Sequence, residues 1–142
     1  MLSEAKQKIV AVLALIFGGD KVTAEYCLVN LISRVYHTEG TLHIGNVPLN
    51  ITGLDNNHSS ILVQFLKEIL PLFSVFESTT DSLSETMWQP KKNYDTNRLN
   101  ESVLGEMPTL SNLLIDETLM NEGKIEKNGV DNIKAIATLI EE

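Results

Sequence analysis

The sequence has little cysteine and no long hydrophobic run. Its single cysteine, Cys27, excludes an internal disulfide and a zinc site built from a cysteine cluster, and it is typical of a protein in a reducing compartment. The longest uninterrupted apolar run, residues 9–17, has nine residues, whereas a membrane-spanning helix needs about 18. No small-residue cleavage site follows this run, so a secretory signal is not indicated. The sequence predicts a soluble intracellular protein without a membrane partner.

Basic residues are scarce as well. Eleven Lys and Arg stand against nineteen Asp and Glu, which gives a net charge of −8. Residues 99–142 alone hold nine acids and only three lysines. An acidic surface repels DNA, RNA and anionic membranes, so direct binding to nucleic acid is not expected.

The remaining composition is typical of one folded domain. Hydrophobic residues make up 43% and charged residues 21% of 142 residues, a balance that allows a substantial core. Helical and strand-like segments alternate, which predicts an α/β fold with a layered sheet flanked by helices. The last helix is expected to end on two uncapped acids, Glu141 and Glu142, where the helix dipole favours cations. Residues 1–142 are therefore predicted to form a single α/β domain or a fragment of one.

The spacing of apolar residues places the individual elements. Helices are predicted at residues 5–17, 22–36, 61–70 and 133–140, with one helical turn at 79–85. Strands are predicted at residues 41–51, 73–76, 102–107 and 112–117, with a long structured loop at 86–102 and a turn at Asn128-Gly129. Residues 10–17 also fit a buried strand, because periodicity does not separate the two structures there. The helix at 22–36 is apolar nearly all round, so it is expected to be buried in the middle of the fold.

A pair of carboxylates follows one predicted strand. Three apolar residues, 113–115, precede Asp116 and Glu117. This is the pattern of a Walker B segment in ATPases, in which the Asp holds Mg²⁺ and the Glu orients the attacking water. Strands often end in acids, so the signal alone is weak. It leaves a nucleotide-dependent enzyme that uses Asp116 and Glu117 as the alternative function.

The phosphate cradle that such an enzyme needs is degenerate. Gly19, Asp20 and Lys21 precede a predicted helix, as a Walker A loop does. Glu25 and Tyr26, however, occupy the places of the phosphate-binding lysine and the hydroxyl residue. An acid at that place repels a triphosphate. The sequence therefore argues against ATP hydrolysis.

Other reactive side chains show no catalytic or metal-binding pattern. His37, His43 and His58 are scattered, without the spacing of a metal site. Cys27 lies inside a predicted buried helix, where it is expected to act as a small hydrophobe. No cofactor, no metal and no catalytic residue is predicted.

A basic and aromatic cluster lies in the predicted loop. It consists of Trp88, Lys91, Lys92, Tyr94 and Arg98. One interpretation is a loop whose long side chains cover apolar surface and pair with local acids. Another is a contact surface, because Trp, Tyr and Arg are frequent interface anchors. Nucleic acid is the least favoured partner, because only three cations stand against the net charge of −8.

Five short segments, in their order along the chain, carry a resemblance to a known family. They are residues 17–26 (FGGDKVTAEY), 31–36 (LISRVY), 44–53 (IGNVPLNITG), 90–99 (PKKNYDTNRL) and 114–119 (LIDETL). Together with residues 129–133 (GVDNI), they resemble the MCM complex-binding protein family, whose members are partners of the minichromosome maintenance (MCM) helicase. The resemblance covers nearly the whole chain. Family members are much longer, and residues 103–107 read VLGEM where the family usually has GLLQL.

The resemblance implies a non-catalytic nuclear protein that binds MCM subunits in DNA replication. It implies a role in assembling, stabilising or unloading the helicase on chromatin during the cell cycle, and in sister-chromatid cohesion. It also implies a degenerate AAA+-like core related to the MCM proteins, a pseudo-ATPase that could mimic an MCM subunit at a subunit interface. The basic and aromatic cluster is the predicted contact surface for the partner.

Overall fold

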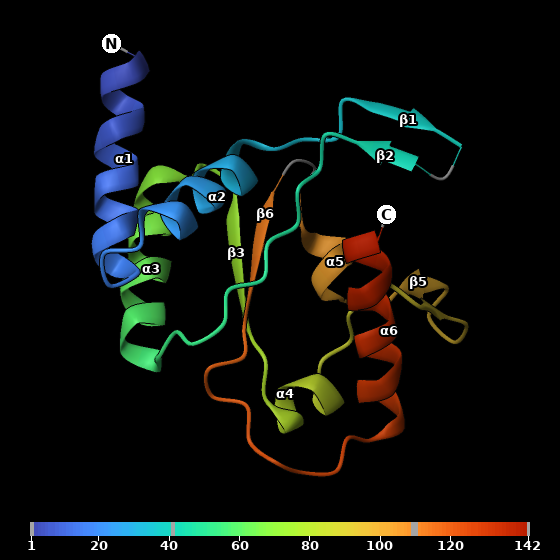
Figure 1. Ribbon diagram of the computed structural model, residues 1–142. Coiled ribbons are helices and arrows are strands. Elements are labelled where there is room, and N and C mark those ends of the chain that lie inside the picture. Colours follow the sequence, from blue (N-terminus) through green and yellow to red (C-terminus); the bar gives the residue numbers. More distant parts are fainter. Residues whose placement is uncertain (1, 41, 109–110, 142) are drawn as a thin grey trace. The chain divides into compact units, whose positions relative to one another are not determined.

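A computed structural model describes residues 2–40, 42–108 and 111–141 (Figure 1). The chain divides into two compact units, unit 1 with residues 1–71 and unit 2 with residues 72–142. Helices are mixed with three two-stranded sheets among the described residues.

Unit 1 consists of three helices and a small hairpin. The helix α1 (Leu2–Ile16) packs against α2 (Lys21–Ile32) and α3 (Asn56–Ile69). The strands β1 (His37–Glu39) and β2 (Leu42–Ile44) pair antiparallel, with Thr38 opposite His43. The buried apolar side chains of the three helices are Leu13, Ala14, Ile16, Ala24, Cys27, Leu31, Leu62 and Leu66.

Two aspartates start the second and third helices. The Asp20 side chain accepts hydrogen bonds from the backbone N–H groups of Val22 and Thr23, and Asp55 accepts one from that of His58. These bonds satisfy N–H groups that have no partner within a helix. Between α1 and α2, Gly18 and Gly19 have φ of 64° and 95°, a conformation that favours glycine. The chain can therefore turn sharply and begin α2 at Lys21.

Two predictions for unit 1 are confirmed and two are wrong. Residues 5–16 are helical rather than a strand, and α3 covers residues 61–69 of the helix predicted at 61–70. Residue 41 of the strand predicted at 41–51 lies outside the described residues. Of residues 42–51, only Leu42–Ile44 form a strand, because Gly45 turns the backbone with φ of 108°. The expected burial of the helix at 22–36 on all sides is also wrong. Only one side of α2 faces the core, and four apolar residues are exposed: Val22, Tyr26, Val29 and Ile32.

Unit 2 is built around one pair of parallel strands. The strand β3 (Phe73–Glu77) pairs with β6 (Asn112–Asp116), and Val75 lies opposite Leu114. The crossover between them contains α4 (Thr80–Glu85), the hairpin β4 (Lys92–Asn93) and β5 (Arg98–Leu99), and α5 (Val103–Glu106). The last helix, α6 (Lys127–Glu141), packs against α4. Parallel strands need such a long connection, because a tight turn cannot join them.

Trp88 lies at the centre of unit 2. Its side chain is 0% exposed, and its ring meets that of Phe76 edge-on with centroids 4.6 Å apart. Leu83 of α4 and Ala135 of α6 are buried as well. Aromatic rings in this arrangement stabilise a core beyond the area that they bury.

The strands at 73–76 and 112–117 are confirmed in unit 2, and so is the helical turn at 79–85. The strand predicted at 102–107 is wrong, because Ser102 accepts a hydrogen bond from the Gly105 N–H and starts the helix α5 instead. The predicted turn at Asn128-Gly129 is also wrong, since α6 already begins at Lys127. The predicted loop at 86–102 contains the β4–β5 hairpin.

Candidate partner-binding surface

The Walker A-like segment lies in unit 1, where it follows a helix. A Walker A loop connects a strand to a helix, whereas Gly18-Gly19 follows α1. Asp20 Oδ1 accepts hydrogen bonds from Val22 N (2.9 Å) and Thr23 N (3.1 Å), and Asp20 Oδ2 accepts one from the Thr23 hydroxyl (2.6 Å). The Thr23 hydroxyl and then its N–H lower the pKa of Asp20 below its usual value. The backbone N–H groups of Val22 and Thr23, to which a phosphate at this helix start would bind, therefore already donate to the Asp20 carboxylate.

The other residues of the degenerate site do not complete a phosphate cradle. Glu25 and Tyr26 both lie on the exposed side of α2. Lys21 is the first residue of that helix, where its charge opposes the helix dipole. Lys21, Glu25 and Tyr26 thus all lie on α2, but they do not form an anion-binding site.

Asp116 and Glu117 lie at the carboxyl end of β6 in unit 2. The Asp116 carbonyl accepts a hydrogen bond from Ser78 N–H (2.7 Å), and Asp116 Oδ1 accepts one from Thr118 N–H (2.9 Å). Glu117 is exposed. Within the described ranges, His, Cys, Asp and Glu form no group of three that could hold a metal ion. The structure brings Asp116 together with Ser78 and Thr118, in the unit that does not contain the Walker A-like segment.

Cys27 is buried in α2 beneath the surface of unit 1. Burial raises the pKa of its thiol to about 11. The thiol is therefore protonated near neutral pH and is a poor nucleophile. Its expected role as a small hydrophobe in the core is confirmed.

The β4–β5 hairpin presents most of the predicted basic and aromatic cluster. Lys92 pairs with Leu99 and Asn93 with Arg98. In the connecting turn, Asn93 Oδ1 accepts hydrogen bonds from the N–H groups of Asp95 (3.0 Å) and Thr96 (3.2 Å). Asn97 has φ of 54°, which Asn tolerates better than most residues. These local bonds fix the hairpin without burying its side chains.

The hairpin exposes an aromatic ring beside cations. Tyr94 is 85% exposed, and Lys92 Nζ lies 5.5 Å from the centroid of its ring. Leu99 is exposed on β5, and Lys91 and Arg98 are exposed as well. Tyr and Arg are enriched in protein-contact surfaces, so the open Tyr94 beside Arg98 favours this interpretation.

Trp88 does not belong to this surface. The sequence placed it among the contact residues, but its side chain is in the core of unit 2 with Phe76. We name the exposed part the hairpin surface, which consists of Lys91, Lys92, Tyr94, Arg98 and Leu99.

One exposed apolar surface was missed from the sequence. Val22, Tyr26, Val29 and Ile32 lie on the side of α2 that faces away from the buried Cys27. In sequence, α2 is apolar on nearly all sides, so periodicity does not reveal which side is exposed. Only the packing of α2 on α1 separates the two sides.

Among the residues that the structure describes, no helix has both the length and the apolar character needed to span a bilayer.

Comparison with known proteins gives one family. A family model described as "Mini-chromosome maintenance replisome factor" matches residues 1–142. The chain is similar to proteins named "Mini-chromosome maintenance complex-binding protein". The Drosophila melanogaster protein is 37% identical over 131 residues, which cover 90% of this chain and 22% of the relative. The Homo sapiens protein is 30% identical over 141 residues (98% of this chain, 22% of the relative), and the Gallus gallus protein is 28% identical over 141 residues with the same coverage.

The chain thus spans about a fifth of the length of these relatives, 22% in each case. No solved structure matches the chain.

Proposed function

Because the chain belongs to the mini-chromosome maintenance replisome factor family, we propose that it takes part in binding the MCM complex during DNA replication. The family resemblance predicted from the sequence is confirmed by the match over residues 1–142. The relatives are named for binding this complex. We propose the same binding for the present chain. We also propose that it acts in the nucleus, as the resemblance implies.

The proposed role is binding without catalysis. The observation that supports it best is the hairpin surface, which holds Tyr94 open to a partner on a turn fixed by Asn93. The N-terminus of α2 is capped by its own Asp20, which argues against a nucleotide there. A contact surface is thus better supported than an active site.

The finer roles stay predictions. Helicase assembly, stabilisation or unloading, and sister-chromatid cohesion, describe what the resemblance implies for whole family members. The degenerate AAA+-like core also stays a prediction, because no solved structure matches the chain. Each of these roles would use a contact with the MCM complex, so the contact is the first property to test.

The test compares two exposed tyrosines. We expect purified MCM complex to bind the immobilised chain, and Tyr94→Ala to weaken this binding by at least about tenfold, as loss of an aromatic interface anchor does. Tyr36 in unit 1 is 77% exposed, so Tyr36→Ala is the matched control and should leave binding unchanged. Affinity is measured by biolayer interferometry.

Two results contradict the proposal. Failure of the folded wild-type chain to bind the MCM complex would rule out an MCM contact in these residues. Equal affinity of the Tyr94→Ala variant and the wild type would show that Tyr94 of the hairpin surface does not contribute to the contact. Circular dichroism of each variant confirms that it is folded.

A further inference from the structure

One face of α6 carries lysines that the sequence did not connect with the hairpin. Lys127, Asp131 and Lys134 are four and three residues apart, so they lie on the same side of the helix. Both lysines are exposed, and Asp131 is half-buried between them. The acidic stretch at residues 99–142 therefore carries two exposed lysines on one side of α6.

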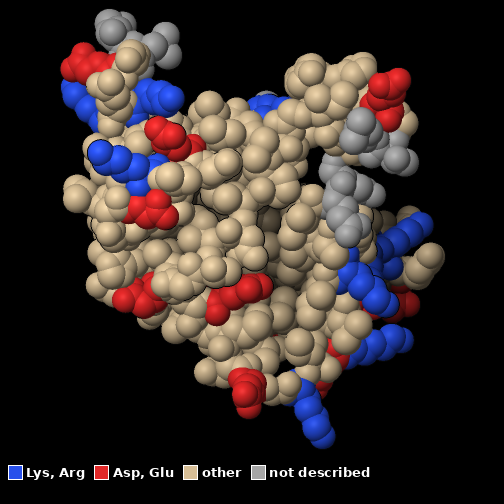
Figure 2. Space-filling model, viewed as in Figure 1, with Lys and Arg blue, Asp and Glu red and all other residues tan. Residues whose placement is uncertain are grey.

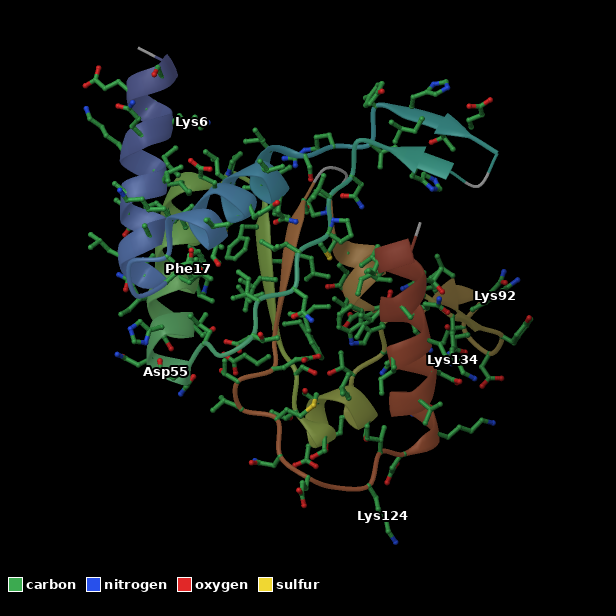
Figure 3. All side chains as sticks on the ribbon, viewed as in Figure 1. Lys6, Phe17, Asp55, Lys92, Lys124 and Lys134 are labelled. Carbon is green, nitrogen blue, oxygen red and sulfur yellow. The ribbon has the colours of Figure 1, made fainter. Side chains whose placement is uncertain are left out.

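This face of α6 borders the hairpin. Lys91, at the start of the hairpin, contacts the aspartate that lies between the two lysines of α6. Its Nζ atom is 3.8 Å from Asp131 Oδ2. Figure 2 shows Lys and Arg side chains on the side of unit 2 that carries the hairpin and α6, with some Asp and Glu side chains among them. In Figure 3, Lys92 and Lys134 point to this same side. The two elements therefore contribute to one surface.

The local charge of this surface is opposite to that of the chain. Residues 91–101 and 126–134 hold five cations and four acids, a local balance of +1, whereas the whole chain has a net charge of −8. The five cations are Lys91, Lys92, Arg98, Lys127 and Lys134. At physiological salt, charges interact over about 8 Å, so a ligand at this surface experiences mainly these local charges, in which cations exceed acids.

We propose that the hairpin surface and the α6 lysines form one basic surface that binds an acidic segment of a protein partner. This inference rests on the proposed function, because the segment would belong to the MCM complex. Carboxylates of the segment pair with the five cations, and an apolar or aromatic residue within it packs on Tyr94 and Leu99. The Lys91–Asp131 pair is long and half-exposed, so Lys91 can exchange Asp131 for a carboxylate of the partner at small cost.

The arrangement favours a peptide over nucleic acid. Duplex DNA carries a negative charge every 1.7 Å or so along its axis and would extend from this surface over the acidic remainder of the chain. A short acidic segment ends before it reaches those acids. Asp95 and Asp131 also lie among the cations. The closely spaced phosphates of a duplex would come near these two acids, whereas the carboxylates of a short peptide can be spaced so that they avoid them.

The test uses the full 142-residue chain and a labelled poly-L-glutamate probe of about ten residues, short enough to end within the basic surface. We expect binding by fluorescence anisotropy at low salt that weakens steeply as salt is added. The double variant Lys127→Glu/Lys134→Glu should weaken it by about tenfold. The matched control, Lys6→Glu/Lys67→Glu, changes the net charge equally at exposed positions of unit 1 and should keep wild-type affinity.

A second variant changes the affinity in the other direction. Asp131→Asn removes the acid between the two lysines and releases Lys91, so we expect about two- to threefold tighter binding of the probe. A lost fold cannot produce this gain. No binding by the wild-type chain, or equal losses in the two double variants, would overturn the proposal.

Two further probes separate this inference from the proposed function. Tighter binding of a 20-base-pair DNA duplex than of poly-L-glutamate would make the surface a nucleic-acid site and refute the inference. If the MCM complex binds the wild type and Lys127→Glu/Lys134→Glu equally, the inference fails and the proposed function stands. If poly-L-glutamate binds as expected but the MCM complex does not, the basic surface stands and the proposed function fails.

Discussion

At the scale of single residues, one buried amide connects α6 to the end of α4. Asn132 Nδ2 donates hydrogen bonds to the carbonyls of Leu83 (2.7 Å) and Thr86, and Asn132 Oδ1 accepts one from Trp88 N–H (3.2 Å). We expect Asn132→Leu to lower the free energy of unfolding by about 2–4 kcal/mol, because it removes the partners of three backbone groups, two of them in buried hydrogen bonds. Urea denaturation followed by Trp88 fluorescence measures this loss.

Asn128→Leu is the matched control for that substitution. Asn128 is exposed on the first turn of the same helix, and surface substitutions usually change stability by less than about 0.5 kcal/mol. Leu has a higher helix propensity than Asn, so a similar loss in both variants would mean that an added apolar side chain, and not the loss of the three hydrogen bonds, determines the effect.

At the scale of elements, the start of α2 depends on a titrating cap. Hydrogen bonds from the Thr23 hydroxyl and N–H lower the pKa of Asp20 below its usual 3.8. The stabilisation by the ionised cap is complete above that value, and it is lost as the pH falls below it through the native pKa. Asn also caps helices well and does not titrate, so we expect Asp20→Asn to keep the melting temperature near pH 7 and to reduce its fall in acid.

Melting temperatures measured by circular dichroism from pH 7 to pH 2 test this expectation. Hydrogen bonds from His58 likewise lower the pKa of Asp55 at the start of α3, so the variant should still lose some stability in acid. A fall as steep as that of the wild type would show that the Asp20 cap contributes nothing to acid sensitivity.

The elements also show how much of the fold was predictable. The helices α1 and α3 and the strands β3 and β6 follow from local apolar patterns. The start of α6 did not, because Asn128-Gly129 is a typical turn pair. Gly129 instead lies where α6 approaches α4, and a Cβ atom there would meet side chains of Ile125 and Ser84. Close packing, which is a tertiary property, explains this glycine.

The candidate site shows the same division between local and tertiary information. The exposed Tyr94 and its neighbouring cations were found from composition, because they lie within eight residues, 91–98. Trp88 was misplaced, since an aromatic side chain suits a core and an interface equally. The lysines of α6 were missed because Lys91 and Asp131 meet only in the folded unit.

At the scale of the whole molecule, the two halves of the degenerate nucleotide site belong to different units. Gly19 to Tyr26 lie in unit 1, and Asp116 and Glu117 lie in unit 2. The first half follows a helix and is capped by Asp20, so it has no free amides for a phosphate at those positions. We therefore expect isothermal titration of the full chain with Mg²⁺-ATP to show no saturable heat. The rival enzyme hypothesis requires saturable heat that Asp116→Ala abolishes. Glu101→Ala, at an exposed acid of unit 2, is the control that retains it. That result would restore a nucleotide-binding site that depends on Asp116, without a Walker A loop of the usual kind.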